Sequence, residues 1–152
     1  MLMKQIMMID DDPISVAIVK AWLASEYEVI TNASGLQALG HLQKNEPPDL
    51  ILLDIVMPGT DGMQVLKVLK ETPRLATIPV IFLTSMDSPE VQLEGYIHGV
   101  DDFLQKPVDE RLLKLKIQRQ LYIADLKKEN LRLRQSAQMI KLQIDQVLDK
   151  FL

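Results

Sequence analysis

Two groups of carboxylates, each placed directly after an apolar segment, are the residues of this chain most suited to chemistry. Residues 10–12 are consecutive aspartates after an apolar run that ends at Ile9, and Asp54 follows four aliphatic residues. Such short apolar runs are typical of strands buried on both faces of a parallel sheet, and ligands bind at the carboxyl ends of these strands. Carboxylates from two strand ends would form one acidic pocket suited to a hard cation.

Segments typical of strands and helices alternate along the first 108 residues. Pro13 and Ser34 are helix-start signals, because proline is tolerated in the first turn and serine caps helices. After Ser34, the spacing of Leu36, Leu39 and Leu42 predicts an inward face. Five strand–helix units in series predict an α/β fold with a doubly wound parallel sheet. The expected strands are residues 5–9, 27–31, 50–54, 80–84 and 102–105.

Residues 109–152 contain neither glycine nor proline, and we expect one helix of about 44 residues there. From Ile123 on, two series of mostly apolar residues repeat every seven positions, three residues apart, which is the pattern of a coiled coil. We therefore expect two domains, residues 1–122 and residues 123–152, and the second is expected to form a homodimer. Its dimer seam consists of Ile123, Leu126, Asn130, Leu133, Ala137, Ile140, Ile144, Val147 and Phe151.

Asn130 lies at an a position of the heptads, where a buried amide is best paired with its twin across a parallel two-stranded coiled coil. Glu129 at a g position could reach Arg134 of the second copy, which also favours parallel helices. Leu131 and Leu142 lie outside the dimer seam. A long solvated helix or a packed helical hairpin therefore stays open as an alternative.

Composition and charge narrow the possible classes of protein. The 152 residues have no cysteine, which excludes disulfide scaffolds and thiolate chemistry. The net charge of −4 combines an acidic first part, with 7 basic and 15 acidic residues up to position 108, and a basic remainder. Neither a signal peptide nor an apolar run of about 20 residues is present. We therefore expect a cytoplasmic protein that has no membrane segment.

Acidic, hydroxyl and lysine side chains recur at four expected strand ends, in residues 10–13, 54–62, 83–85 and 99–107. In order and placement these motifs resemble the receiver domain of two-component response regulators. The resemblance implies a flavodoxin-like five-stranded sheet of order 2-1-3-4-5, with the fifth helix extended into a coiled coil. It also implies a phosphoryl group taken from a sensor histidine kinase or a phosphotransfer protein. The signal would pass through the last helix to a dimer or an output domain.

The resemblance gives roles to the residues that match its motifs. Asp54 would be the phosphoacceptor. Mg²⁺ or Mn²⁺ would be held by Asp10, Asp11, Asp54 and the backbone carbonyl of Val56, whereas Asp12 would lie outside this site as a surface or capping acid.

Two further positions would bind the phosphoryl group, namely Thr84 through its hydroxyl and Lys106 through its ammonium. The Lys106–Pro107 bond matches a family position that has a cis peptide. Thr84 and Phe103 would form the switch, in which the hydroxyl moves inward and the aromatic ring follows. The ring here is a phenylalanine and so lacks a hydroxyl.

Other classes of function fit less well. An aspartate-nucleophile phosphatase would need a second acid two residues after Asp54, where the chain has Val56. The basic residues near Lys127 could bind nucleic acid, but a solvated helix face explains them better. A fragment of a regulator with a nucleic-acid-binding or nucleotide-cyclase output remains an alternative. We expect no enzymatic activity beyond phosphorylation and dephosphorylation of Asp54.

Overall fold

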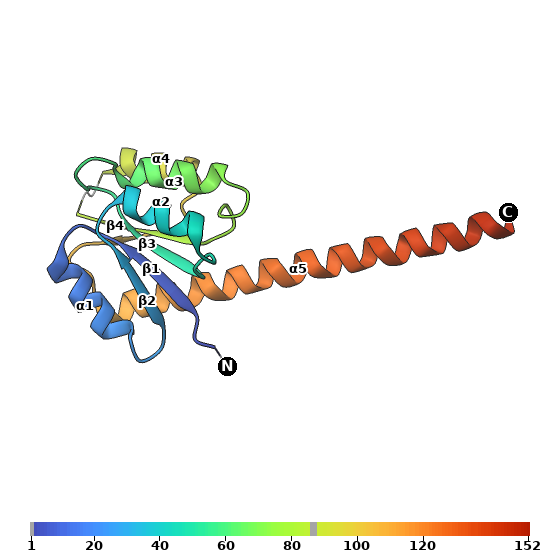
Figure 1. Cartoon of the computed structure of the whole chain (residues 1–152), viewed down its shortest axis with the longest axis horizontal. Coiled ribbons are helices and arrows are strands. Elements are labelled where there is room, and N and C mark those ends of the chain that lie inside the picture. Colours follow the sequence, from blue (N-terminus) through green and yellow to red (C-terminus); the bar gives the residue numbers. More distant parts are fainter. Residues whose placement is uncertain (1, 86–87) are drawn as a thin grey trace. The chain divides into compact units, whose positions relative to one another are not determined.

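The computed structural model describes residues 2–85 and 88–152, in which strands and helices alternate. The strands are β1 (Gln5–Ile9), β2 (Glu28–Asn32), β3 (Leu50–Asp54), β4 (Val80–Thr84) and β5 (Asp102–Gln105). The helices are α1 (Pro13–Leu23), α2 (Gly35–Lys44), α3 (Gly62–Glu71), α4 (Pro89–Ile97) and α5 (Glu110–Phe151), as labelled in Figure 1.

All neighbouring strands are parallel, and their order in the sheet is β2-β1-β3-β4-β5. This order confirms the predicted doubly wound fold. Four strands have the predicted bounds, whereas β2 lies one residue later than predicted. The shift arises because Tyr27 N–H still donates to Leu23 in the turn after α1, and the first bond to the neighbouring strand comes from Glu28.

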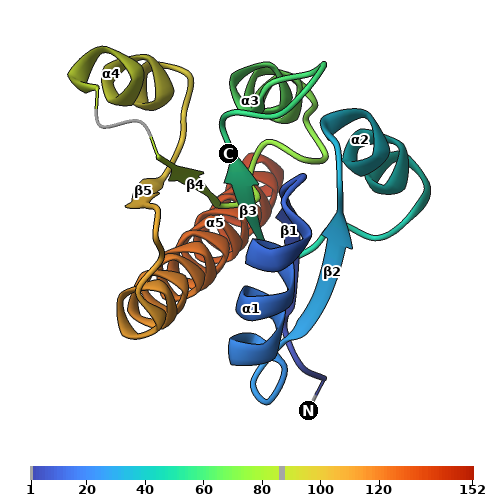
Figure 2. The same ribbon diagram turned by 90° about the vertical axis from the view of Figure 1, so that its left-hand side faces the viewer.

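Two apolar cores lie on the two faces of the sheet. Figure 2 shows α2, α3 and α4 over one face, and α1 with the first turns of α5 over the other. Because successive side chains of a strand point to opposite faces, Met7 and Ile9 belong to the first core and Met8 to the second. Strands covered on both faces explain the unbroken apolar runs in the sequence.

Side-chain caps start the helices that follow the strands. Asp12, Ser34 and Asp61 each accept a hydrogen bond from the backbone in the first turn of α1, α2 and α3. The prediction that Leu36 faces inward is wrong, because 72% of its surface is exposed. The buried stripe of α2 consists of Gly35, Ala38 and Leu42, one position out of phase with Leu36.

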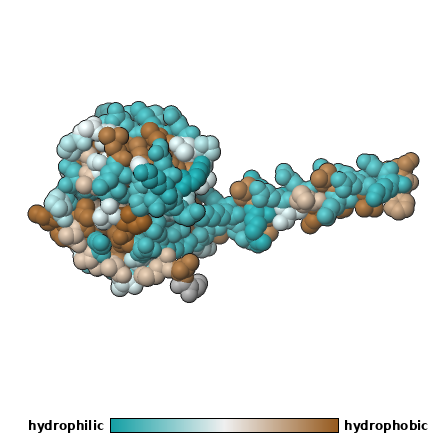
Figure 3. All heavy atoms as spheres, in the orientation of Figure 1, coloured by the Kyte–Doolittle hydropathy of each residue, from teal (hydrophilic) through white to brown (hydrophobic). Residues whose placement is uncertain are grey.

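The chain divides into two compact units, Met1–Leu121 and Tyr122–Leu152. In the first unit, α5 buries Leu113, Ile117 and Leu121. From residue 125 onward every residue of α5 is exposed, with hydrophobic side chains at intervals among hydrophilic ones (Figure 3). None of the helices in the described part of the chain combines the length and the apolar character of a membrane span.

Candidate functional site

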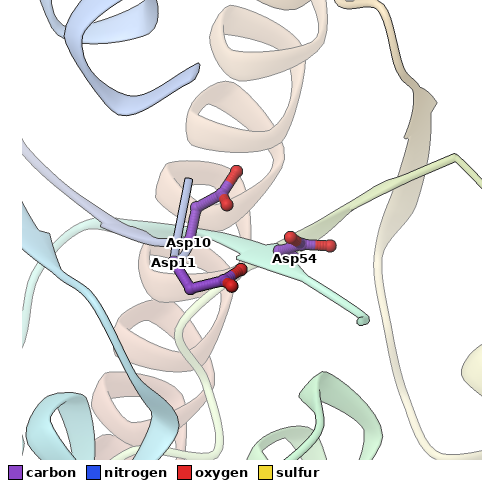
Figure 4. Close-up of side chains that lie close together, drawn as sticks. All are labelled: Asp10, Asp11 and Asp54. Atoms are coloured by element: carbon purple, nitrogen blue, oxygen red, sulfur yellow. The ribbon is translucent and has the colours of Figure 1, made fainter. Parts of the chain in front are cut away.

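The ends of β1 and β3 bring the predicted acidic residues together. The two strands are neighbours in register, with Ile9 beside Leu53, so that Asp10 and Asp54 follow at the same level of the sheet. Carboxylate oxygens of Asp10, Asp11 and Asp54 lie within 4.8 Å of one another. Figure 4 shows these three side chains around one small space at the end of the sheet. Residues more than 40 positions apart in the sequence thus form a single acidic cluster.

Lys106 extends from the end of β5 into this cluster. Its Nζ atom lies 2.8 Å from Oδ2 of Asp10 and 3.2 Å from Oδ2 of Asp54. The backbone N–H of Lys106 donates to the carbonyl of Thr84 at 2.8 Å, which fixes the start of the β5–α5 connection against β4. The predicted cis peptide bond between Lys106 and Pro107 is present.

The electrostatics of the cluster are those of a buried carboxylate next to a lysine. Asp54 is only 6% exposed. Burial raises the pKa of its carboxyl to about 6; Lys106 opposes this rise and Asp10 adds to it. Burial also tends to lower the pKa of Lys106, but the hydrogen bond to Asp10 and the charge of Asp54 outweigh it, so that this pKa is raised. Lys106 therefore stays charged, and its single positive charge faces a cluster of three carboxyl groups.

The third aspartate of the acidic run has a structural role, as predicted. The side chain of Asp12 caps α1 by accepting from the Ile14 N–H at 3.1 Å and from the Ser15 hydroxyl at 2.7 Å. Its own backbone N–H donates to Oδ1 of Asp10 at 2.9 Å. Asp12 therefore helps to orient Asp10 and is absent from the cluster of carboxylates.

Gly62, the last residue of the motif in residues 54–62, lies close to the chain that carries Asp54. A Cβ atom on this glycine would lie 2.3 Å from the backbone oxygen of Asp54 and 2.7 Å from Cα of Ile55. The N–H of Gly62 donates to the carbonyl of Ile55 at 2.8 Å. Only glycine permits this approach of α3 to the chain that carries Asp54. The motif contained the glycine, but the close contact depends on the three-dimensional path of the loop.

The predicted switch residues both lie in the interior, Thr84 as the last residue of β4 and Phe103 as the second residue of β5. Thr84 is 3% exposed and Phe103 is 9% exposed. The Phe103 ring packs between Phe82 and Tyr96, with ring centroids 5.4 Å and 5.2 Å apart. Thr84 and Phe103 also line a common cavity of about 270 Å³. Phe103 is thus in an inward position, with space beside it.

The side chains of the cluster fit a hard divalent cation. Their donors are carboxylate oxygens, which are the ligands that Mg²⁺ and Mn²⁺ prefer in proteins. Asp11 is exposed, and of the three acids it is the one that Lys106 does not hold. The backbone N–H of Val56 donates to Oδ1 of Asp54 at 3.1 Å, which orients the acceptor carboxylate. The Val56 carbonyl stays a predicted ligand.

Comparison with known proteins points to one family. The family model described as the response regulator receiver domain matches residues 6–118. The response regulator PleD of Caulobacter vibrioides is 39% identical over 110 residues, which are 72% of this chain and 24% of PleD. Protein PilH of Pseudomonas aeruginosa is 35% identical over 112 residues, which are 73% of this chain and 92% of PilH. The chain therefore spans about a quarter of the length of PleD and nearly all of PilH.

Solved structures agree with the sequence relatives. The chemotaxis protein CheY4 of Vibrio cholerae superimposes with a TM-score of 0.73 at 31% sequence identity. The match covers 78% of this chain and 98% of CheY4. The shared part corresponds in extent to the α/β unit, since the family model ends at residue 118.

Proposed function

The chain belongs to the family of response regulator receiver domains, and from this membership and the acidic cluster we propose that Asp54 accepts a phosphoryl group. Phosphorylation of an aspartate is typical of the family. The single observation that carries the choice of Asp54 is its place in a buried site at the end of β3, where its carboxylate lies beside Lys106 and the other two acids. The donor would be a phosphohistidine of a sensor kinase or of a phosphotransfer protein.

In the proposed transfer, an oxygen of the Asp54 carboxylate attacks phosphorus and forms a P–O bond. The P–N bond of the phosphohistidine breaks, and its electron pair stays on the imidazole nitrogen, so that an acyl phosphate forms. Most catalysis of such transfers is positioning and charge stabilisation. The N–H of Val56 orients the carboxylate, and Nζ of Lys106 lies 3.2 Å from Oδ2 of Asp54.

We propose that Asp10, Asp11, Asp54 and the Val56 carbonyl hold Mg²⁺ or Mn²⁺. A bound divalent cation supplies positive charge that offsets the repulsion between the carboxylates and the incoming phosphoryl group. Without it, Lys106 is the group that bridges Asp10 and Asp54. Lys106 would shift toward the phosphoryl oxygens after transfer, because these oxygens add negative charge next to Asp54.

The response would pass through Thr84 and Phe103. A hydroxyl at the end of β4 could donate to a phosphoryl oxygen on Asp54 of the neighbouring strand, and Phe103 lines the same cavity as Thr84. Movement of Thr84 would therefore change the space available to the ring. Tyr96 on α4 packs against this ring and is 52% exposed, so that a movement of the ring would alter the surface there.

The phosphodonor protein would approach over α1. A mostly apolar hollow of about 210 Å³ lies beside Lys106 and is also lined by Ile18, Trp22 and Pro107. Ile14 on the same helix is 69% exposed. Apolar groups exposed next to a charged site are typical of protein contact surfaces. An Ile18→Lys variant should then lose transfer from a phosphohistidine protein and keep transfer from a small phosphodonor.

Residues 123–152 would form the parallel homodimer, because a second copy would bury their exposed apolar stripe. Asn130 would set the register of the two helices. In the single chain Glu129 bonds to Arg132 at 2.6 Å within its own helix, so a pair with Arg134 of a second copy would require an exchange of partners. Six of the dimer-seam residues are large hydrophobic side chains that are at least half exposed, namely Leu126, Leu133, Ile140, Ile144, Val147 and Phe151.

Phosphorylation and dephosphorylation of Asp54 would be the only chemistry of this part of the chain. The phosphatase alternative finds no support, because Val56 is apolar and 56% exposed where a second acid would be needed. The proposal is tested by incubating the full chain with Mg²⁺ and acetyl phosphate and measuring intact mass. A gain of one phosphoryl group is expected for the wild type and none for Asp54→Asn or in EDTA. Equal gains in wild type and variant would refute the assignment.

A further inference from the structure

Asn32 holds a buried amide that lacks a partner within the described residues. The residue is 5% exposed, and its Nδ2 group donates no hydrogen bond to any of them. Burial of an unpaired amide costs free energy, because the bond to water is lost and not replaced. Alanine or valine would avoid this cost at the end of a strand. The unpaired Nδ2 group of Asn32 therefore indicates that an acceptor reaches it in another state of the protein, such as one with a bound ligand.

The position of Asn32 places this donor next to the acidic run. Asn32 is the register partner of Ile9 at the end of β1, and its carbonyl accepts a hydrogen bond from Asp10 N–H at 3.1 Å. Asn32, Asp10 and Asp11 line one hollow of about 300 Å³ between β2 and the start of α1. Asn32 thus borders the acids from the side opposite β3, because β1 lies between β2 and β3.

The two sides of the acidic cluster differ in what holds the carboxylates. Lys106 holds Asp10 and Asp54, whereas Asp11 is exposed and outside its reach. Carboxylates that bind a cation are commonly held in turn by an outer hydrogen-bond donor, which fixes their orientation. Within the lining of the hollow, Asn32 supplies a neutral donor of this type.

We propose that Asn32 is a positioning residue of the cation site, whose amide donates to the carboxylate of Asp11 when a divalent cation is bound. The inference rests on the cation site of the proposed function. It explains why an amide remains at a buried position that an apolar side chain would occupy at lower cost. Because the amide is neutral, it would hold the Asp11 carboxylate without neutralising the negative charge that attracts the cation.

The test measures Mg²⁺ binding to the full chain by calorimetry, with no phosphodonor, and thermal unfolding in EDTA. The variants are Asn32→Ala and Asn32→Val, and Thr31→Val is the matched control on the same strand and in the same hollow. Both Asn32 variants should bind Mg²⁺ about tenfold more weakly and unfold in EDTA at the same or a higher temperature than the wild type. Thr31→Val should leave the Mg²⁺ affinity unchanged.

Three results would overturn the inference, and they separate it from the proposed function. If the wild type binds Mg²⁺ and both Asn32 variants bind it equally well, Asn32 has no part in the site while the cation site stands. If both variants unfold at a much lower temperature in EDTA, the amide serves the fold. If the wild type itself binds no Mg²⁺, the proposed cation site and this inference fail together.

Discussion

Lys106 Nζ lies 2.8 Å from Oδ2 of Asp10, a residue 96 positions away in the chain. The Asp10 side chain is fully buried, and its carboxylate accepts hydrogen bonds from Lys106 Nζ and from the N–H of Asp12. Lys106 therefore has two roles. It stabilises the fold of the cation-free protein through Asp10, and it places a positive charge next to Asp54.

The first prediction concerns removal of this lysine. Lys106→Met should destabilise the protein in EDTA by roughly 2–4 kcal/mol, because two buried carboxylates lose their counter-charge. Mg²⁺ should restore much of the loss, since it supplies positive charge at the same acids. Denaturant unfolding with and without Mg²⁺ measures both effects, with exposed Lys44→Met as control. A variant as stable as wild type in EDTA would show that the contact contributes little.

The second prediction follows from the raised pKa of Asp54. In the folded state the carboxyl binds its proton more tightly than in the unfolded chain, so stability in EDTA falls as pH rises from about 4 to about 6. Asp54→Asn removes this loss. The variant should be more stable than wild type at pH 7.5, by up to about 3 kcal/mol for a rise of the pKa from 3.8 to about 6.

Near pH 3, below the usual pKa of 3.8, the carboxyl is largely protonated in both states, and the gain of Asp54→Asn should nearly vanish. Thermal unfolding in EDTA across this pH range is the measurement. Mg²⁺ should reverse the order at pH 7.5, because it binds the wild-type carboxylate and not the amide. A variant less stable than wild type in EDTA at pH 7.5 would contradict the buried, unfavourable charge.

The third prediction concerns Gly95 on α4, which makes room for the Phe103 ring. A Cβ on Gly95 would lie 2.6 Å from Cζ of Phe103, so Gly95→Ala should push the ring toward the adjacent cavity. The chain has only three phenylalanines, so ¹⁹F NMR of fluorophenylalanine-labelled protein can follow each ring. The Phe103 signal should move, together with that of Phe82.

Gly40→Ala on α2 is the matched control, because a Cβ there meets no atom within 4 Å. It should raise stability by about 1 kcal/mol, the usual gain for this change within a helix, and leave the spectrum unchanged. An unmoved Phe103 signal in Gly95→Ala would mean that α4 yields instead of the ring.

The fourth prediction concerns association through the dimer seam. Leu133→Lys places a charge at a d position and should convert a dimer into a monomer in sedimentation equilibrium. Gln135→Lys, at an f position on the outer face of the same helix, should leave the dimer intact. A wild type that remains monomeric at high concentration would refute the dimer and favour a solvated helix.

Much of the fold was predictable because its signals are local. The runs at Leu50–Asp54 and Val80–Thr84 are apolar since both faces of the sheet are covered, and their bounds were predicted. Ser34 and Pro13 marked helix starts through backbone chemistry. Leu36 was misplaced because three leucines at helical spacing looked like a stripe, while two of the three buried positions of α2 belong to the small residues Gly35 and Ala38.

The site was predictable to the level of residue types but not of contacts. Strand ends identified Asp10, Asp11 and Asp54, because parallel strands share one carboxyl edge. The stronger pairing of Lys106 with Asp10, the close approach of Gly62 and the orphan amide of Asn32 depend on side-chain packing between distant segments. No spacing in the sequence contains that information.

The most direct measurement of the central claim locates the phosphoryl group on the chain. After incubation with Mg²⁺ and acetyl phosphate, borohydride reduces an aspartyl phosphate to homoserine, and peptide mass spectrometry then identifies its position. Homoserine at position 54, and only in Mg²⁺-treated protein, is the predicted result. Homoserine at position 10 or 11 with Asp54 unmodified, or no homoserine at any position, would contradict the account.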